Sequence, residues 1–392
     1  MAVKTNFESN GQRYYRITYD VGIDANGKRI RKQFTGKTKK EAEQKKQDYI
    51  NKMNSGIQNK TYWFAQEMKT WLFEVVKMSG NIKLSSFSRY AGIYEKYFES
   101  CPFAHMSLDK IEPIDIQRYY NALHKDGKSS NIIKNNNKLL KQFFNYAVDC
   151  GYILKNPCSG KKVVIPTDDV KELDNIEKTV PVFSKEDMNK ILSNKEDTKI
   201  RYISLISYAT GMRRDEILGL KESDIDYKNN EIHIRRTLVS TYVYDDEGKR
   251  HKKTFLDNTK THTSVRDIPL PSSLIPIIKA AISLKKQNIL KCGSSFNREH
   301  IDMIFLTENG ELIDAGNIDK SWIYFLKRCK VNHLKFHALR HTYATLQFEN
   351  NIRIETVSKL LGHSTIEMTA NTYTHVLKKE KQKAVDTLSL LG

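Results

Sequence analysis

Three residues stand in patterns that suit the binding of a phosphate group. Arg213 lies in the run TGMRRDEILGL, just after Gly211, which should end an apolar helix over 202–209. A new helix is expected to start at once, so that Arg213 stands in its first turn, where free backbone N–H groups and the helix dipole favour an anion. In HALRH, His337 and Arg340 share one face of a helix. Paired guanidiniums can clamp a phosphodiester and neutralise the charge that grows on its oxygens.

A further histidine and a tyrosine follow near the end of the chain. The run LGHS places His363 on a turn, because Gly362 should end the apolar helix before it. Tyr373 comes 10 residues later in NTYTH, and its phenolic oxygen can act as a nucleophile that forms a covalent intermediate. Histidines beside the same phosphate can hydrogen-bond to it or move a proton. Taken alone, Tyr373 could equally pack a core, since the chain has 20 tyrosines.

The histidines admit one metal-binding alternative. His337 and His341 have the spacing of the two histidines of a zinc finger, but such a site needs a cysteine pair upstream, and Cys329 stands alone. No cluster of aspartates suited to Mg²⁺ lies beside the arginines in the sequence. We therefore expect no metal and no cofactor, with guanidinium groups in place of a metal clamp.

The whole chain is strongly basic. Its 392 residues include 65 Lys and Arg against 46 Asp and Glu, a formal charge of +19. A polyanionic partner is the natural interpretation, because lysines and arginines that neutralise phosphates release counterions. A lysine-rich surface that serves only solubility is the alternative. Five cysteines without a CxxC pair, and no apolar leader or membrane-spanning run, favour the reducing cytoplasm.

Residues 1–60 are expected to form a small sheet backed by one helix. Residues 14–20 and 28–34 alternate apolar and polar side chains around the turn signal DANG. Thr38 and Glu41 have the spacing of a capping box, which predicts that a polar helix begins there. The segment holds 14 Lys or Arg against 6 Asp or Glu, so the sheet would carry a basic face that can enter a DNA groove. A minor domain with solvated lysines is the alternative.

Residues 61–166 have the apolar spacing of helices. Large apolar side chains recur every three or four residues, as on one buried helical face. The pattern predicts four helices: the first over 63–76, the second capped by Ser85 or Ser86, the third beginning at Pro113 and the fourth around 139–148. We interpret this segment as a compact helical bundle with basic edges.

A linker and a mixed segment complete the chain. Residues 167–180 carry mixed charge and few large apolar side chains, which is typical of a linker. Residues 181–392 mix helix signals with a strand block over about 231–270. We therefore predict a multidomain chain that is mainly α with small β elements, ending in a mixed α+β domain. An apolar tail could dock on its own domain or on a neighbouring protomer, through Ala384, Val385, Leu388, Leu390 and Leu391.

Taken together, the motifs TGMRRDEIL, HALRH, LGH and YTH, in that order, resemble those of the tyrosine recombinases, a family that includes lambda-type phage and conjugative-element integrases. The likeness spans nearly the whole chain. Residues 1–60 are similar to arm-type DNA-binding domains, 61–166 to the helical core-binding (SAM-like) domain, and 181–392 to the catalytic domain with its C-terminal tail.

The resemblance also identifies candidate site residues. By their places in the motifs they are Arg213 and Arg340 as catalytic arginines, His337 and His363 as phosphate-site histidines, Tyr373 as the nucleophile, Lys260 as the catalytic lysine and Glu216 as a supporting acid. Lys260 is placed by the run TKTHTSVRDIP, since the family's lysine lies in a hairpin before a strand that ends in Ile-Pro, and His262 and Arg266 are the substitutes for it as proton donor. The sequence departs from the family's motif at Arg214, which offers a second guanidinium beside Arg213.

The resemblance implies a site-specific recombinase that integrates and excises a mobile element. Tyr373 would attack a phosphate to give a 3′-phosphotyrosine, and a 5′-hydroxyl of a partner strand would reverse the step, through a Holliday junction and without ATP or metal. The expected partners are double-stranded DNA with core-type and arm-type attachment sites, three further copies of the chain in a tetramer, an excisionase and a host DNA-bending protein, with no membrane. The alternatives are a strand transferase like type IB topoisomerases and a non-catalytic DNA-binding regulator.

Overall fold

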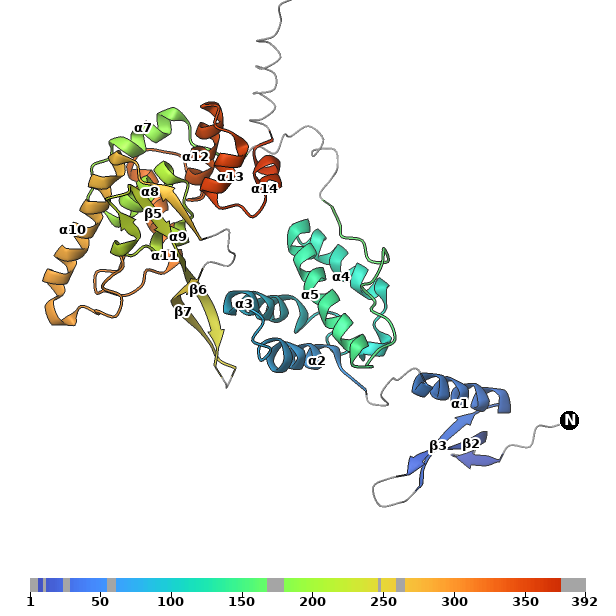
Figure 1. The fold of residues 1–392 in the computed structure, drawn as a ribbon. Coiled ribbons are helices and arrows are strands. Elements are labelled where there is room, and N and C mark those ends of the chain that lie inside the picture. Colours follow the sequence, from blue (N-terminus) through green and yellow to red (C-terminus); the bar gives the residue numbers. More distant parts are fainter. Residues whose placement is uncertain are drawn as a thin grey trace, which may run out of the picture. The chain divides into compact units, whose positions relative to one another are not determined.

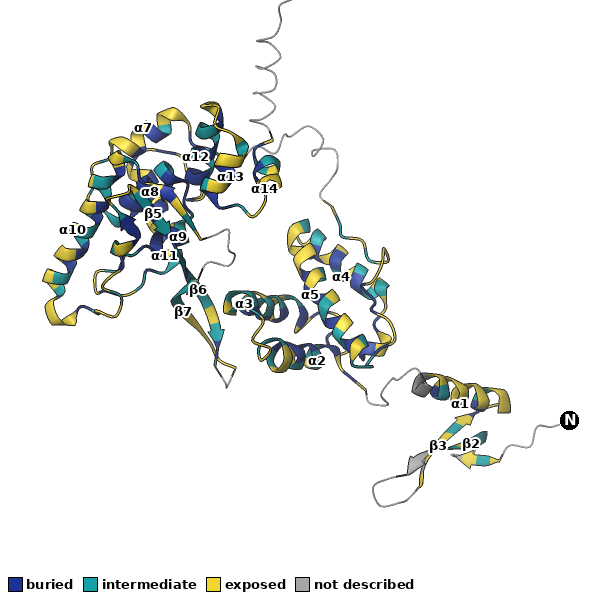
Figure 2. Ribbon diagram, in the orientation of Figure 1, coloured by how far each residue is buried: buried dark blue, intermediate teal, exposed yellow. Residues whose placement is uncertain are grey.

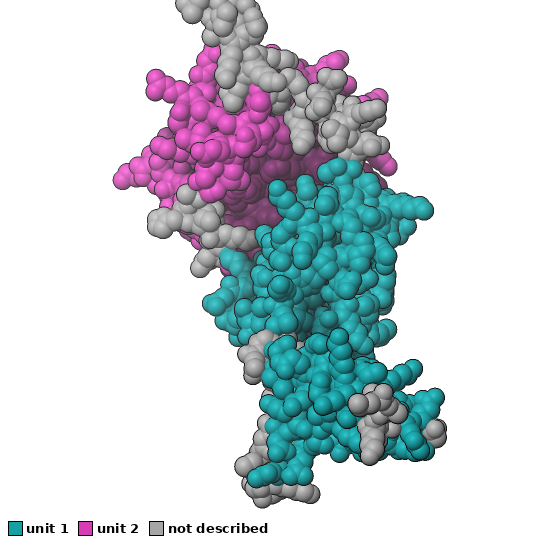
Figure 3. Space-filling view, turned by 90° about the vertical axis from the view of Figure 1, so that its right-hand side faces the viewer, with its two compact units in different colours: residues 1–169 teal, residues 170–392 magenta. Residues whose placement is uncertain are grey.

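The structure is a computed structural model, and it describes residues 6–9, 12–23, 29–54, 61–167, 180–245, 248–258 and 265–374. The chain forms two compact units, residues 1–169 and 170–392, coloured separately in Figure 3. The division into a basic domain, a bundle and a linker stays a prediction, since residues 55–60 and 168–179 lie outside the described residues.

The N-terminal part of unit 1 is a three-stranded antiparallel sheet with one helix (Figure 1). Its elements are β1 (Phe7–Ser9), β2 (Gln12–Ile23), β3 (Arg29–Gly36) and α1 (Lys39–Asn54). The two predicted strands and the helix are confirmed, and β1 is an addition. Thr38 caps α1 as predicted, because its Oγ1 accepts a hydrogen bond from the Glu41 N–H at 3.2 Å. The turn DANG lies outside the described residues.

The rest of unit 1 is a helical bundle. It contains α2 (Phe64–Thr70), a π-helical turn (Trp71–Val76), α3 (Leu84–Ile93), a second π-helical turn (Tyr94–Phe98), α4 (Pro113–Lys125) and α5 (Ser130–Asp149). Phe64 lies in its core, with its ring centroid 4.9 Å from that of Phe103 and 5.7 Å from that of Phe143. The four predicted helices are confirmed. The predicted cap of the second was wrong, because Lys83 is its N-cap residue and the two serines lie inside its first turn.

Unit 2 is built around one helix that is buried on nearly every side. This helix, α8 (Lys199–Thr210), packs against α10, α11 and α12, and its ribbon is mostly dark blue in Figure 2. An all-round apolar helix needs such a central position. The other helices are α7 (Lys185–Ser193), α9 (Arg214–Leu218), α10 (Ile275–Cys292), α11 (Ala315–Arg328), α12 (Ala338–Glu349), α13 (Ile354–Leu361) and α14 (Ile366–Thr372).

The described residues of unit 2 form two small antiparallel sheets. Four of their five strands lie within the predicted strand block, and one short strand, 225–226, precedes it. One has the order β4 (Ile225–Asp226), β5 (Glu231–Ile234), β8 (Arg266–Pro269), and the other is the hairpin of β6 (Arg236–Tyr244) and β7 (Arg250–Asn258). In the first sheet Ile232 pairs with Ile268, and Ile234 pairs with Arg266. This register places Arg266 opposite Ile234. The predicted fold class, mainly α with small β elements, is confirmed.

No helix among the described residues is long and apolar enough to cross a membrane. All the predicted site residues of unit 2 except Lys260 lie at or next to helix ends: the ends of α8, α13 and α14 and the starts of α9 and α12. That lysine falls in the segment 259–264, between β7 and β8, which lies outside the described residues.

Candidate active site

The turn between α8 and α9 places Arg213. Gly211 ends α8 with φ of 67°, in the left-handed region that favours glycine. A Cβ atom here would lie 2.5 Å from the ring of Tyr343, so a side chain would not fit. Arg213 is the N-cap residue of α9 rather than a member of its first turn, which corrects the prediction by one position.

Glu216 holds Arg213 in that place. Its Oε2 accepts the Arg213 backbone N–H at 2.9 Å, and its Oε1 accepts Arg213 Nη1 at 2.8 Å. The Arg213 side chain remains 36% exposed, so its guanidinium can reach a ligand from solvent. The neighbouring Arg214 is turned elsewhere, with hydrogen bonds from Nε to Asp215 at 2.8 Å and from Nη1 to Asp319 at 2.6 Å. Of the two adjacent guanidiniums, the one on Arg213 therefore faces the candidate site.

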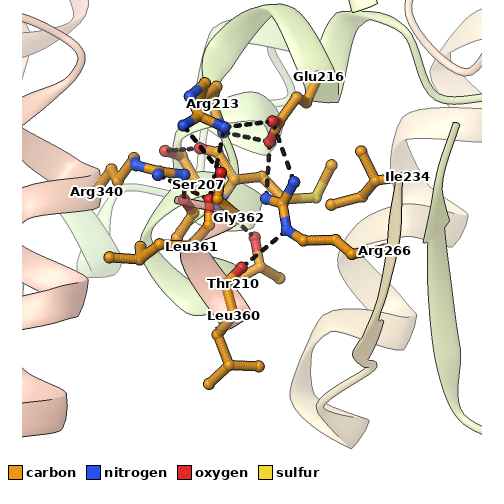
Figure 4. A network of polar contacts seen from close by, with 12 residues as sticks. Ser207, Thr210, Arg213, Glu216, Ile234, Arg266, Arg340, Leu360, Leu361 and Gly362 are labelled. Carbon is orange, nitrogen blue, oxygen red and sulfur yellow. Dashed lines mark hydrogen bonds and ion pairs between the residues drawn. The ribbon is translucent and has the colours of Figure 1, made fainter. Parts of the chain in front are cut away.

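Arg340 is almost fully buried and ties three helices together. It lies in the first turn of α12 and is 2% exposed. Its Nη1 donates to the Gly211 carbonyl at 2.8 Å, and its Nη2 donates to the Leu361 carbonyl at 2.7 Å (Figure 4). Burial and the nearby charge of Arg213 lower the pKa of Arg340 to about 9. A buried guanidinium held only by neutral carbonyls favours the approach of an anion.

A third arginine, Arg266, completes this network. Its Nη1 and Nη2 donate to the two carboxylate oxygens of Glu216 at 3.1 and 2.9 Å, and its Nε donates to the Leu360 carbonyl at 2.9 Å. Burial would raise the pKa of Glu216, but the hydrogen bonds and charge of Arg266, with the charge of Arg213, lower it to about 2. Glu216 is therefore ionised at neutral pH. Three guanidiniums and one carboxylate leave a formal charge of +2 on these four side chains.

His363 lies on the turn that follows α13, as predicted. Gly362 ends α13 with φ of 65°, and a Cβ atom there would lie 2.8 Å from Nη1 of Arg266. Its carbonyl lies 3.4 Å from Nη2 of Arg213. The Nδ1 atom of His363 is 2.7 Å from Oγ1 of Thr369, which leaves Nε2 as the ring nitrogen that can bind a ligand. Burial and the charges of Arg340 and Arg213 lower the pKa of His363 to about 4, so the ring is neutral at pH 7.

His337 and Tyr373 complete the group. His337 is the N-cap residue of α12 and is exposed at the surface. Desolvation by the surrounding protein and its cationic neighbours lower its pKa to about 4. Tyr373 follows α14 directly and is 1% exposed. Its hydroxyl lies 2.9 Å from Nδ1 of His341, and its ring packs 5.5 Å from that of Phe348. Burial raises the pKa of Tyr373 to about 12, although the charge of Arg340 opposes the shift.

The structure thus gathers six of the seven predicted residues around the ends of a few helices. Arg213 contacts Glu216 directly, and Arg213 and Arg340 both approach the Leu361 carbonyl. The charge of Arg340 also lowers the pKa values of Tyr373 and His363, in the case of Tyr373 against the larger effect of burial. Lys260 lies outside the described residues, so its role stays a prediction.

Two residues of the site had only minor parts in the sequence interpretation. The sequence suggests Arg266 only as a substitute proton donor, and His341 only as a zinc ligand. The signal for Arg266 was a charged residue in a strand whose alternation should bury it, in SVRDIP. The signal for His341 was its position in the turn after His337, on the same helix face.

The described residues include one group that could hold a metal ion, and it contains none of the predicted site residues. Glu231, His233 and Asp267 offer ligand atoms within 4.8 Å of one another. Asp267 already pairs with Arg235 at 2.6 Å and with His233 at 2.7 Å. Asp267 also follows Arg266 directly on β8, and successive strand residues point to opposite faces. This group is therefore separate from the arginine cluster.

Comparison with known proteins identifies the family of the chain. Residues 181–380 match the family described as "Phage integrase family", and residues 63–124 match "Phage integrase, N-terminal SAM-like domain". A protein of Caldanaerobacter subterraneus subsp. tengcongensis named "Tyrosine recombinase XerC-like" is 45% identical over 392 residues, with 99% of each chain covered.

Solved structures share the fold. The integrase of transposon Tn1549, in complex with a circular intermediate DNA, is 20% identical, with a TM-score of 0.62 over 82% of this chain and 99% of that one. A lambda integrase tetramer bound to a Holliday junction is 17% identical, with a TM-score of 0.53 over 93% of this chain and 96% of that one. The chain therefore belongs to the phage integrase family of site-specific tyrosine recombinases, which are DNA strand-transferring enzymes.

Proposed function

We propose that this recombinase integrates and excises a mobile element through a covalent bond between Tyr373 and DNA. The observation that carries the proposal is the excess positive charge of the site: Arg213 and Arg266 pair with the single carboxylate of Glu216, whereas the buried Arg340 donates to backbone carbonyls. The histidines beside them are neutral and add no charge at pH 7. A phosphodiester supplies negative charge and accepts hydrogen bonds from arginine and histidine N–H groups.

Each residue then has a part in strand cleavage. Arg213, exposed on one side, and Arg340, buried behind it, bind the non-bridging oxygens of the scissile phosphate and stabilise the charge that grows there. His337 and His363 hydrogen-bond to the same phosphate through neutral rings. Glu216 holds Arg213 and Arg266 in place and touches no substrate.

Tyr373 attacks the phosphorus atom, and the 5′-oxygen of the next nucleotide leaves. The product is a 3′-phosphotyrosine and a free 5′-hydroxyl, and attack by the 5′-hydroxyl of a partner strand reverses the step. The phosphodiester bond energy is conserved, so the cycle needs no ATP. The leaving oxygen requires a proton, which we assign to Lys260 on the segment before β8. We propose no metal or cofactor for this chemistry.

Recombination exchanges strands between two duplexes, so we propose that four copies of the chain assemble on DNA around a Holliday junction. The lambda integrase tetramer on such a junction, which has the same fold, supports this assembly. Residues 61–166 would bind core-type sites, and the basic segment 1–60 would bind arm-type sites. We also propose an excisionase and a host DNA-bending protein as partners, in the cytoplasm of a bacterial cell.

A recombination assay tests this function. The protein is mixed with two plasmids that carry the attachment sites found beside its gene and in the host chromosome, and the product junctions are sequenced. We expect joined sites with exchange at one defined position, in the presence of EDTA and without ATP. Tyr373→Phe should give no junctions. Relaxation of the plasmids without exchange, or a requirement for a divalent metal in the chemical step, would contradict the proposal.

A further inference from the structure

Among the described residues, the hydroxyl of Tyr373 has one polar partner, the Nδ1 atom of His341, at 2.9 Å. The tyrosine is 1% exposed and its ring is enclosed by apolar neighbours, among them Phe348 and Leu361. His341 is one turn along α12 from His337, and the two imidazole rings meet edge to face, with centroids 4.8 Å apart. His341 is therefore in direct contact with the oxygen atom that the proposed reaction uses.

The protonation states of the pair are complementary. Burial raises the pKa of Tyr373 to about 12, so the phenol keeps its proton at neutral pH and can donate it. Burial and the charge of Arg340 lower the pKa of His341, so its ring is neutral and Nδ1 can accept. A phenol is a poor nucleophile until its proton leaves, and the proton must pass to a group within hydrogen-bond reach.

We infer that His341 is the general base of strand cleavage, the group that accepts the phenolic proton of Tyr373 as the tyrosine attacks the phosphate. The inference rests on the proposed function, in which Tyr373 is the nucleophile. The O–H bond of the phenol breaks and its proton passes to Nδ1 of His341. The phenolic oxygen forms a bond to phosphorus, the bond to the 5′-oxygen breaks, and that oxygen takes a proton from the general acid assigned to Lys260.

In the second half of the reaction the same residue works in reverse. The incoming 5′-hydroxyl gives its proton to the group assigned to Lys260, which lost one in the first step, and its oxygen forms a bond to phosphorus. The bond between phosphorus and the tyrosine oxygen breaks, and that oxygen regains its proton from His341. The imidazolium formed between the two steps faces His337 and Arg340 from its own helix and Tyr373 from the end of α14. These neighbours supply no negative charge in the free protein. A bound phosphate supplies it, so proton transfer is favoured when DNA occupies the site.

The test isolates the attack by tyrosine from the departure of the 5′-oxygen. The substrate is attachment-site DNA in which sulfur replaces the bridging 5′-oxygen, because a thiolate leaves without a proton. The rate of covalent adduct formation is measured from pH 5.5 to 9.5 for the wild-type chain and for His341→Asn. Asparagine can accept the hydrogen bond of Tyr373 but cannot take its proton.

We expect the wild-type rate to be level from neutral to alkaline pH and to fall in acid as His341 takes up a proton, because the pKa of His341 is lowered. His341→Asn should be slower at pH 7 by roughly a hundredfold to ten-thousandfold, and its rate should rise continuously with pH as Tyr373 begins to ionise. Lys260→Ala should be fast on this substrate. A His341→Asn rate equal to wild type, or a slow rate with the level profile of wild type, would overturn the inference.

Two controls separate this inference from the proposed function. Tyr373→Phe on the same DNA tests the nucleophile: an adduct of normal yield would sink the proposed function, whereas no adduct together with normal His341→Asn sinks only the inference. His333→Asn, at an exposed position before α12, should keep the wild-type rate and pH profile. Thermal unfolding of each variant checks the fold, and His341→Gln gives the same comparison if His341→Asn does not fold.

Discussion

At the scale of single residues, the site is organised by one buried carboxylate. Glu216 contacts the backbone and side chain of Arg213 and both terminal nitrogens of Arg266, and it is 4% exposed. Its two oxygens therefore hold the partly exposed guanidinium of Arg213 next to the buried guanidinium of Arg266. Since removing one partner from a buried ion pair leaves uncompensated charge, the arrangement is sensitive to the loss of this one group.

Replacement of Glu216 by glutamine should lower the free energy of unfolding at pH 7 by roughly 3–5 kcal/mol, because two arginines would lose their shared counter-charge. The pKa of Glu216 is lowered from 4.5 to about 2, so its stabilisation is complete above pH 4.5 and is lost as the pH falls toward 2. Urea unfolding of wild type and Glu216→Gln across this range should show the gap closing with acid. Glu349→Gln, at an exposed helix end, is the control, and an equal gap at all pH values would refute the role of ionised Glu216.

The adjacent arginines of the first motif offer a matched pair. Arg213 faces the site, whereas Arg214 is bound to Asp215 and Asp319. Arg213→Ala should slow covalent adduct formation by roughly a hundredfold to a thousandfold, as the loss of one charge-stabilising donor does. Arg214→Ala should leave the rate within a few-fold of wild type. Single-turnover cleavage of attachment-site DNA measures both, and the reverse order of effects would show that the wrong guanidinium was assigned.

The sequence predicted these residues unevenly, for a physical reason. Arg213, Arg340 and His363 were predictable because helix-ending glycines and helical spacing are local signals. The ion pair of Arg266 with Glu216 joins residues 50 positions apart, and the contact of His341 with Tyr373 joins residues 32 apart. Such contacts are set by tertiary packing, which cannot be predicted from the spacing of residues within one segment.

At the scale of elements, two glycine-terminated helices shape the site. Gly211 and Gly362 end α8 and α13 in the left-handed conformation, and Arg340 bonds to the carbonyls of Gly211 and Leu361 at these two ends. The helix ends therefore present both backbone acceptors and the turns that carry Arg213 and His363.

Gly362→Ala tests this arrangement. The new Cβ atom would meet the guanidinium of Arg266 at 2.8 Å, in addition to the strain of a positive φ. We expect a lower melting temperature and at least tenfold slower adduct formation. Gly127→Ala has a similar φ of +76° and nothing within 4 Å of its Cβ atom, so it should cost only about 1–2 kcal/mol and leave cleavage unchanged. Equal behaviour of the two variants would show that the contact with Arg266 does not matter.

The elements themselves were largely predictable. The alternation in 14–20 and 28–34 and the spacing in 139–148 each correspond to an observed strand or helix, because the buried face of each is continuous in sequence. Strand β1 is short and offers too little alternation to be recognised. The second bundle helix begins at Leu84, and its N-cap residue, Lys83, makes no side-chain cap hydrogen bond, so no capping side chain marks the start of this helix in the sequence.

At the scale of the whole molecule, charge is the dominant feature. The chain carries +19, and residues 1–60 contribute 14 Lys or Arg against 6 Asp or Glu, a net of +8. A protein that binds DNA through two separate parts should lose a share of its salt dependence when one part is removed, because fewer counterions are released.

Deletion of residues 1–60 should therefore make the plot of log K against log salt shallower and remove the footprint on arm-type DNA. Cleavage of isolated core-site DNA should persist, since the predicted site residues lie at 213–373. Binding titrations at several salt concentrations and footprinting measure these effects. An unchanged slope with an unchanged footprint would show that the segment takes no part in DNA binding.

In the proposed reaction Tyr373 forms a covalent bond to the 3′-phosphate of a cleaved strand. Attachment-site DNA with a nick next to the cleavage position traps the covalent product, because the short 5′ fragment diffuses away and rejoining fails. Mass spectrometry of the digested adduct then identifies the modified peptide. We expect one nucleotide-linked peptide, which contains Tyr373 and is attached through a 3′-phosphate. The Tyr373→Phe variant should give no nucleotide-linked peptide. A link at another residue, or one through a 5′-phosphate, would contradict the proposed reaction.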